Sequence, residues 1–244
     1  MTGEADLAVI GALLADRTRA TILLTLLNGG LTSASALADR AGVSRPLASS
    51  HLRKLTEGGL LAVEPQGRQR LYRLSSQAVA DALEILILLA PPAVVRSLRT
   101  ANEGQMLRRG RLCYDHLAGR LGVAISEQLV ARGYLERTAE DFVTTPAGER
   151  AFAELGLDVA ALRAQPRPLS RACMDWSERD HHLAGSLGAA LAGELLRRGW
   201  LQGREASRVV VVTDAGRAGL EQLLGLDPST LELRNGSSPK EVAA

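Results

Sequence analysis

Apolar residues recur at helical spacing through most of the first 90 residues, and two short runs alternate instead. The spacing predicts amphipathic helices over residues 4–15, 17–28, 33–41 and 44–57. The alternating runs, 60–64 and 70–74, flank a turn that contains Pro65 and Gly67. Two such runs around a Pro/Gly turn are typical of a β-hairpin.

Residues 44–57 combine an apolar stripe of Leu47, Leu52 and Leu55 with a polar, basic face. A turn at Ala41-Gly42-Val43 separates this helix from the one before it. Two helices joined by a tight turn that contains Gly form a helix-turn-helix, whose second helix can enter the DNA major groove. Followed by the hairpin, this arrangement predicts a winged helix.

Positive charge is concentrated in the same region. Between Ser44 and Arg73 there are six Arg or Lys and two Glu, a net charge of +4, whereas the whole chain has +2. Local positive charge is expected where a protein binds phosphates. It therefore favours a winged helix that binds DNA over one that is used only for protein contacts. The residues expected to contact DNA are Ser44, Arg45, Ser49, Ser50, His51, Arg53, Lys54, Arg68 and Arg70.

These residues divide by role. Side chains at the start of the helix can reach base edges or the flanking phosphates. Arg53 and Lys54 are better placed to neutralise phosphates. Arg68 and Arg70 lie on the wing and suit the DNA backbone or minor groove. His51 has two interpretations, one on the DNA-facing side and one in helix packing.

Residues 7–90 resemble the ArsR/SmtB family of bacterial winged-helix repressors. The matching segments are residues 13–23, 36–44, 50–55, 67–68 and 72–74. The resemblance implies a dimer that binds an inverted-repeat operator in double-stranded DNA. Metal sensors of this family use a Cys-rich motif before the turn or an Asp/His set on the last dimer helix. Residues 32–42 have no Cys or His and residues 77–90 have no His, so neither site is present.

Residues 77–90 form a helix that is apolar on nearly every face, and such a helix must be buried. A second subunit is the expected cover, as the resemblance also implies. Burial under the C-terminal half of the same chain is the alternative, and both can hold. The expected dimer interface comprises Leu7, Ile10, Leu14, Leu83, Leu86 and Ile87.

Composition narrows the class of protein. The 244 residues are 46% hydrophobic, enough for one large or two small cores. The longest apolar run is too short to span a membrane, and there is no secretory signal, so we expect a cytoplasmic protein without a membrane partner. Two cysteines in such a chain are expected to be free thiols. No phosphate-binding Gly loop, Gly-x-Ser-x-Gly or His-Glu-x-x-His motif is present, so we do not expect an enzyme.

The C-terminal half repeats itself. Residues 111–164 and 169–227 share an Arg-x-Cys-x-Asp start, His-Leu-Ala-Gly, Arg-Gly-aromatic-Leu, Thr-x-Ala-Gly and Gly-Leu-Asp in the same order. About fifteen identities at consistent offsets indicate an internal duplication of a helix-helix-hairpin-helix unit. Overall we predict a mainly α fold with small β-hairpins (α+β). The predicted divisions are a winged helix over 1–92, a connection over 93–110, the two repeats, and a disordered tail over 228–244.

Both cysteines and three of the four histidines fall in the repeated motif. If its first segment is helical, Cys113 and His116 share one face, and packing of the repeats about a pseudo-twofold axis would bring equivalent motifs together. Cys, His and carboxylate are ligands of thiophilic or borderline metals, so a divalent transition metal or a metalloid is a candidate cofactor. The candidate ligands are Cys113, Asp115, His116, Cys173, Asp175 and His182; His181 lies beside them.

Other interpretations remain open at this point. The thiols could pack as small hydrophobes, or respond to oxidants. Arg111 with Asp115, and Arg171 with Asp175, could be ion pairs at i, i+4 spacing on a helix. The repeats could also enclose a small organic ligand in an apolar pocket, or recruit a partner protein. The sequence therefore predicts a DNA-binding transcriptional regulator, a repressor, whose C-terminal half senses an effector of unassigned chemistry.

Overall fold

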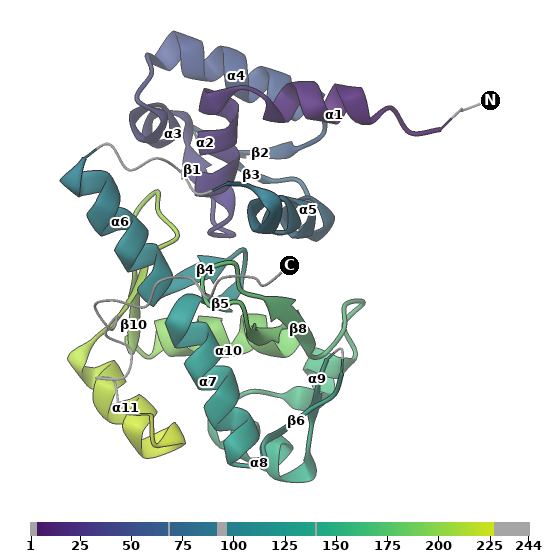
Figure 1. Cartoon of the computed structure of the whole chain (residues 1–244), viewed down its shortest axis with the longest axis vertical. Helices are drawn as coiled ribbons and strands as arrows, with labels where there is room; N and C mark the ends of the chain where they lie inside the picture. Colours follow the sequence, from purple (N-terminus) through teal and green to yellow (C-terminus); the bar gives the residue numbers. More distant parts are fainter. Residues whose placement is uncertain (1–3, 68, 92–96, 140, 227–244) are drawn as a thin grey trace, which may run out of the picture.

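The computed structural model of the chain describes residues 4–67, 69–91, 97–139 and 141–226. Figure 1 shows two lobes, a winged helix formed by the N-terminal residues and a second lobe formed by the repeats. Each lobe has its own core of buried Leu, Ile, Val and aromatic residues. The predicted tail lies outside the described residues. No helix in the described segments is long and apolar enough to cross a membrane.

The winged helix contains five helices and a three-stranded sheet. Its helices are α1 (Leu7–Leu14), α2 (Arg17–Leu26), α3 (Ala34–Ala41), α4 (Arg45–Glu57) and α5 (Gln77–Leu89). Its strands are β1 (Thr32–Ser33), β2 (Leu61–Gln66) and β3 (Gln69–Leu74), in the order β1-β3-β2 and all antiparallel. The predicted helices and wing hairpin are confirmed. Strand β1 was not predicted, because two residues are too short to show an alternating pattern in the sequence.

Short polar residues set where these helices begin. The side chains of Asp16, Ser33 and Ser76 accept hydrogen bonds from backbone N–H groups in the first turns of α2, α3 and α5. Such caps satisfy N–H groups that have no partner inside the helix. Gly42 ends α3 in the left-handed conformation, with φ of 66°, and so sets the turn before α4.

The second lobe begins with α6 (Leu98–Arg109), in the predicted connection. The first repeat forms β4 (Arg111–Cys113), β5 (His116–Ala118), α7 (Gly119–Ala131), β6 (Leu135–Arg137), β7 (Phe142–Thr144), α8 (Pro146–Glu154) and α9 (Val159–Arg163). The second repeat forms β8 (Arg171–Met174), β9 (His181–Ala184), α10 (Gly185–Arg197), β10 (Leu201–Gly203), β11 (Val210–Val212) and α11 (Asp214–Leu224). Apart from α9, the element order is the same in both repeats.

One expectation for the repeats is wrong, because each begins with a β-hairpin and not a helix. Strands β4 and β5 pair antiparallel with Cys113 opposite His116, and β8 and β9 pair with Cys173 opposite His182. In the first repeat the turn needs a residue at positive φ, and Tyr114 adopts 62° there. Turns of this kind usually carry Gly, Asn or Asp, so Tyr114 gave no turn signal in the sequence.

The repeated Thr-x-Ala-Gly motif starts α8 and α11. Thr213 accepts a hydrogen bond from the backbone N–H of Gly216 (3.0 Å) and donates one to the carbonyl of Gly199 (2.7 Å). A Cβ atom added at Gly216 would lie 1.9 Å from the carbonyl oxygen of Trp200. The first repeat has the same contacts, with Gly148 against the carbonyl of Tyr134. Glycine is required in both because backbone approaches backbone.

The repeats pack reciprocally around one shared core. Helix α7 of the first repeat contacts β9 of the second, and α10 of the second contacts β5 of the first. A Cβ atom at Gly122 on α7 would lie 3.6 Å from Cβ of His182, and one at Gly188 on α10 would lie 3.4 Å from Cβ of His116. This exchange of helices places the two Cys/His hairpins face to face.

We expect Gly216→Ala to lower the free energy of unfolding by about 1–3 kcal/mol, because the methyl group overpacks against the Trp200 carbonyl. The matched control is Gly193→Ala in the exposed middle of α10, where an added Cβ meets nothing within 4 Å. That variant should be neutral or stabilised by up to about 1 kcal/mol. Urea unfolding followed by circular dichroism measures both, and equal effects would contradict the close approach.

Candidate metal centre and DNA-reading surface

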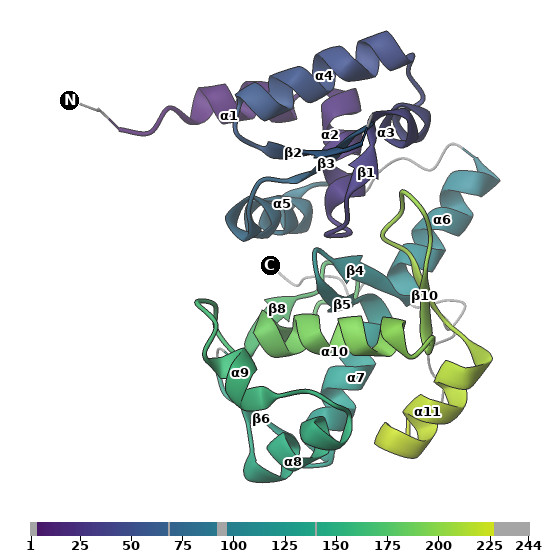
Figure 2. The ribbon, with the colours of Figure 1, turned by 180° about the vertical axis from the view of Figure 1, so that it is seen from behind.

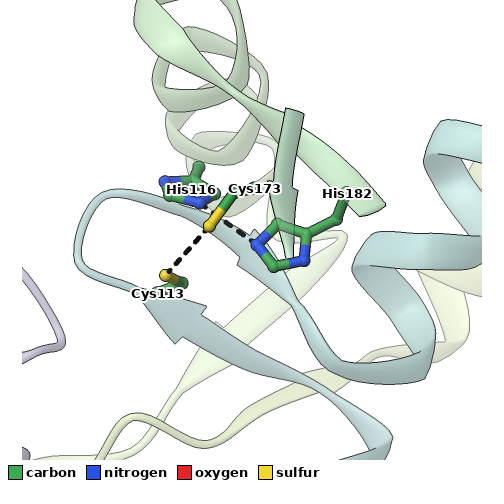
Figure 3. A group of neighbouring side chains, drawn as sticks. All are labelled: Cys113, His116, Cys173 and His182. Carbon is green, nitrogen blue, oxygen red and sulfur yellow. Dashed lines mark hydrogen bonds between the residues drawn. The ribbon is translucent and has the colours of Figure 1, made fainter. Parts of the chain in front are cut away.

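The side chains of Cys113, His116, Cys173 and His182 converge between the two repeats, and Figure 3 shows all four pointing toward one another. Their ligand atoms all lie within 4.8 Å of each other. Each hairpin supplies one sulfur and one imidazole from directly opposed positions. Cys113, His116 and His182 are buried, and Cys173 is partly exposed. We call these four residues the Cys₂His₂ tetrad.

The sulfur–sulfur and nitrogen–nitrogen distances within the tetrad match those of a tetrahedral metal centre. Zn–S bonds of about 2.3 Å and Zn–N bonds of about 2.0–2.1 Å put two sulfurs roughly 3.8 Å apart and two nitrogens roughly 3.3 Å apart at tetrahedral angles. The two Sγ atoms lie 3.9 Å apart, and the two Nε2 atoms lie 3.2 Å apart. Two thiolates and two imidazoles suit Zn²⁺ and similar divalent ions that accept sulfur.

The two candidate carboxylates lie behind the imidazoles and not in the tetrad. Asp115 Oδ1 is 3.3 Å from Nδ1 of His116, and Asp175 Oδ2 is 3.3 Å from Nδ1 of His182. A carboxylate on Nδ1 holds the ring so that Nε2 faces a metal, and it makes the ligand more basic. His181 lies outside the tetrad, beside Arg137 and Asp180.

Asp175 also joins the repeats electrostatically. Its Oδ2 accepts hydrogen bonds from the guanidinium of Arg111 (2.9 Å) and from the N–H of Gly119 (2.6 Å), both in the first repeat. The guanidinium of Arg111 also lies over the Trp176 ring, 4.4 Å from its centroid. Burial opposes ionisation of Asp175, but His182 and Arg111 hold the pKa of this carboxyl far below its usual range. The carboxylate is therefore charged at neutral pH.

The alternative of ion pairs within each motif is wrong. Because the motif is a hairpin, residues four apart do not share a helical face, and each Arg finds a partner elsewhere. Arg111 pairs with Asp175 of the other repeat, and Arg171 pairs with Asp81 of the winged helix. Asp115 pairs with Arg167. The sequence repeat marked these residues as important but did not indicate their partners.

Protons occupy the tetrad when no metal does. Burial lowers the pKa of His182, but contacts with Asp175 and Cys173 outweigh it and raise this pKa to about 9. The hydrogen bond between the sulfurs raises the pKa of Cys113, which burial raises further, and lowers the pKa of Cys173. A metal must displace these protons, so metal affinity should rise with pH.

The second candidate surface is the exposed side of α4. Ser44, Arg45, Ser49, Arg53 and Lys54 are exposed there, and Ser50 is partly exposed. An open groove between α4 and the wing is lined by Ser49, Ser50, Arg53 and Arg70, among others. Arg68 lies outside the described residues. Figures 1 and 2 show α4 at the end of the molecule remote from the repeats.

Two residues of α4 differ from their expected placement. His51 is buried, with Nδ1 3.6 Å from Asp16, so it belongs to the packed side of the helix and not to the exposed one. Leu47 is 47% exposed and does not continue the apolar stripe. The buried stripe is Ala48, His51, Leu52 and Leu55 because these residues recur at i, i+3, i+4 and i+7.

The predicted interface residues fall into two groups. Leu7, Ile10 and Leu86 are exposed, whereas Leu83 is buried in the winged-helix core and Leu14 and Ile87 are partly buried against it. Ile85 and Leu89 extend the exposed apolar side of α5. The repeats contact α5 through Asp81 and Glu84, which pair with Arg171 and Arg208. The described residues of the repeats leave Ile85, Leu86 and Leu89 exposed.

One known protein is similar to this chain over most of its length, and others are similar to its N-terminal third. A helix-turn-helix domain family matches residues 14–64. The chain is 39% identical over 221 residues to an uncharacterized HTH-type transcriptional regulator, YdfF of Bacillus subtilis, covering 91% of this chain and 98% of that one. It is also 39% identical over 84 residues to the HTH-type transcriptional regulator CmtR of Mycobacterium bovis, covering 34% of this chain and 70% of that one. A solved homodimeric winged helix-turn-helix DNA-binding domain, Mb0332 of Mycobacterium bovis, is 28% identical over 36% of this chain and 89% of that one, with a TM-score of 0.32.

We expect the metal-free chain to bind one Co²⁺ or Zn²⁺ per protomer, with the thiolate-to-Co²⁺ absorption of a tetrahedral site. Replacing Cys113 by Ser should abolish that absorption, because the sulfur is a ligand. Asp115→Asn should weaken Zn²⁺ binding about 10–100-fold while keeping the tetrahedral spectrum, because it loosens His116. Asp214→Asn, at a fully exposed carboxylate of α11, is the control. Binding by Cys113→Ser equal to wild type would exclude this centre.

Proposed function

We propose that this chain, which belongs to the HTH-type transcriptional regulators and resembles the ArsR/SmtB family, is a metal-responsive repressor that binds its operator as a homodimer. The observation that carries the proposal is the tetrahedral spacing of the Cys₂His₂ tetrad in a chain that also displays an exposed basic helix. The tetrad supplies the effector site that residues 32–42 and 77–90 lack.

The exposed face of α4 supports DNA recognition. Arg45 stands at the first turn of the helix, where side chains reach base edges once the helix enters a major groove. Arg53 and Lys54, just over two turns further on, are placed for phosphates. Arg70 on the wing borders the same groove, so helix and wing can contact adjacent parts of one duplex.

The exposed apolar side of α1 and α5 supports the dimer. Leu7 is 79% exposed and Leu89 is 78% exposed, and Ile85 and Leu86 lie near Leu89 on the same helix. Large exposed apolar side chains of this kind mark an association site. A twofold dimer would present two α4 helices to an inverted repeat, with half-sites one helical turn or a multiple apart.

The position of the tetrad supports an effector role. It lies between the repeats, directly beyond the residues that contact α2 and α5. A ligand shifts a DNA-binding equilibrium only if it binds the two states with different affinity. A metal that bridges two hairpins binds the two states with different affinity if DNA binding changes the separation of the hairpins. We propose that the loaded form is the one released from the operator.

The first experiment measures operator binding by fluorescence anisotropy, using the DNA upstream of the gene that encodes this chain. Arg53→Ala should weaken binding to all sequences and reduce the slope of log affinity against log salt by about 1, because one phosphate contact is lost. Adding Zn²⁺ or Cd²⁺ to the wild type should weaken operator binding about 5–150-fold. The double variant Cys113→Ser, Cys173→Ser should bind operator normally and ignore the metal.

The controls separate the two halves of the proposal. Arg217→Ala removes an exposed arginine on α11, remote from α4, and should leave affinity and salt slope unchanged. Loss of DNA binding in that variant would show a general charge effect. Equal affinity for operator and random DNA at low salt would reject the regulator. Metal binding without any change in operator affinity would reject the metal response alone.

We expect Leu86→Asp to convert the dimer to monomers, because the association would bury an unpaired carboxylate. The control is Val143→Asp, which places the same charge at an apolar residue of β7 that is 48% exposed in the other lobe. Sedimentation velocity at micromolar concentration distinguishes them. A dimer in Leu86→Asp, or monomers in Val143→Asp, would place the interface elsewhere.

A further inference from the structure

Residues next to the tetrad attach both of its hairpins to the winged helix. Tyr114 follows the ligand Cys113 in the chain, and its N–H donates a hydrogen bond to the carbonyl of Leu27 (2.6 Å), just beyond α2. Arg171 lies two residues before the ligand Cys173. Both of its terminal nitrogens donate to the carboxylate of Asp81 on α5, each at 2.9 Å. The first hairpin therefore contacts the segment that follows α2, and the second contacts α5.

The Tyr114 contact is a close fit of backbone on backbone. A Cβ atom added at Gly29 would lie 2.3 Å from the carbonyl oxygen of Tyr114, so only glycine admits the hairpin tip there. Tyr114 itself adopts a φ of 62°, a conformation that is costly for a non-glycine residue. Its side chain packs against the winged-helix core. The tip is thus held by the segment that follows α2.

A buried ion pair reinforces the attachment to α5. Arg208 donates to Glu84 at 2.6 Å, and both side chains are buried. The carbonyl of Arg208 accepts a hydrogen bond from the N–H of Leu112, which precedes the ligand Cys113. Helix α5 is therefore joined to both ligand strands, by Asp81 to β8 and by Glu84, through Arg208, to β4.

The two attached helices have different roles in the winged helix. Helix α2 packs against α3 and α4, and so supports the recognition helix. Helix α5 carries the exposed apolar side chains Ile85, Leu86 and Leu89 of the proposed dimer interface. The position of α5 relative to α2 therefore sets where α4 stands relative to the dimer axis.

We propose that the Tyr114 tip and the Arg171–Asp81 pair transmit metal occupancy to the DNA-reading surface. This inference rests on the proposed function. A metal at the tetrad fixes the separation of Cys113 from Cys173 and of His116 from His182, and so fixes one hairpin relative to the other. Through the tip on α2 and the ion pair on α5, it then fixes the separation of the recognition helices in the dimer. Small helix shifts at a subunit interface are a known form of such switching.

The test uses full-length chains in which one attachment is broken and the tetrad is untouched. Asp81→Asn keeps the shape of the side chain but removes the negative charge that pairs with Arg171. Tyr114→Gly keeps the backbone hydrogen bond and the positive φ but removes the side chain from the core. The matched control is Glu149→Gln, which breaks an exposed pair with Arg163 inside the first repeat. Zn²⁺ affinity is measured by chelator competition and operator affinity by anisotropy.

Both attachment variants should bind Zn²⁺, and bind operator without metal, within about threefold of wild type. The factor by which Zn²⁺ weakens operator binding, about 5–150-fold in the wild type, should fall to less than a third of its wild-type value. By linkage, saturating operator should weaken Zn²⁺ binding of the wild type by that same factor. In the variants the reciprocal effect should shrink equally. Glu149→Gln should behave as wild type.

A charge-reversed double variant, Asp81→Arg with Arg171→Asp, keeps the proposal testable if a single variant misfolds, because it restores the pair and should restore the coupling factor. Full coupling in both Asp81→Asn and Tyr114→Gly overturns the proposal, as does equal loss in Glu149→Gln. A wild-type chain that binds Zn²⁺ without any change in operator affinity contradicts the proposed function itself, and the route falls with it.

Discussion

The buried carboxylate of Asp175 is the contact on which the C-terminal lobe depends. It accepts hydrogen bonds from Arg111 and from the first N–H of α7 in the other repeat, and from Ser177 in its own loop. The same oxygen that meets Arg111 lies beside Nδ1 of His182. Breaking a buried pair by removing one partner typically costs about 3–5 kcal/mol, because the remaining charge stays buried. One side chain therefore joins the repeats and orients a ligand of the tetrad.

The lobe combines this polar contact with an exchange of helices. Each repeat places its long helix on the other repeat's hairpin, and the glycines Gly122 and Gly188 let those helices approach the opposite histidines. The apolar core then continues across both repeats without a boundary. A tetrahedral spacing of sulfur and nitrogen arises because two equivalent hairpins face each other, each with a Cys opposite a His. Symmetric packing supplies the geometry, and a carboxylate lies beside Nδ1 of each ring.

The tetrad and the exposed face of α4 lie in different lobes, and this limits how a metal at one could affect DNA binding at the other. The recognition helix α4 stands at the far end of the winged helix, whereas β4, β5 and β8, which carry Cys113, His116 and Cys173, lie beyond α5 (Figure 1). Direct electrostatic action of a metal over such a distance is screened by salt. The contacts that connect the two lobes near the tetrad are the hydrogen bond from Tyr114 to Leu27 and the ion pairs Arg171–Asp81 and Arg208–Glu84.

The sequence by itself determined the winged helix, its hairpin, the order of the repeats and the six candidate metal residues. These follow from local signals: helical periodicity, caps, a Pro/Gly turn and identities at fixed offsets. Tertiary structure alone decided that the Cys/His motif is a hairpin, because Tyr114, at the positive-φ position of the turn, is not Gly, Asn or Asp, and this turn contacts Leu27 and Gly29 of the other lobe. It also decided which four of the six residues meet, that Arg111 and Arg171 pair outside their own motifs, and that His51 is buried. Each of these depends on contacts between residues far apart in the chain, and no local pattern of apolar and polar positions encodes such partners.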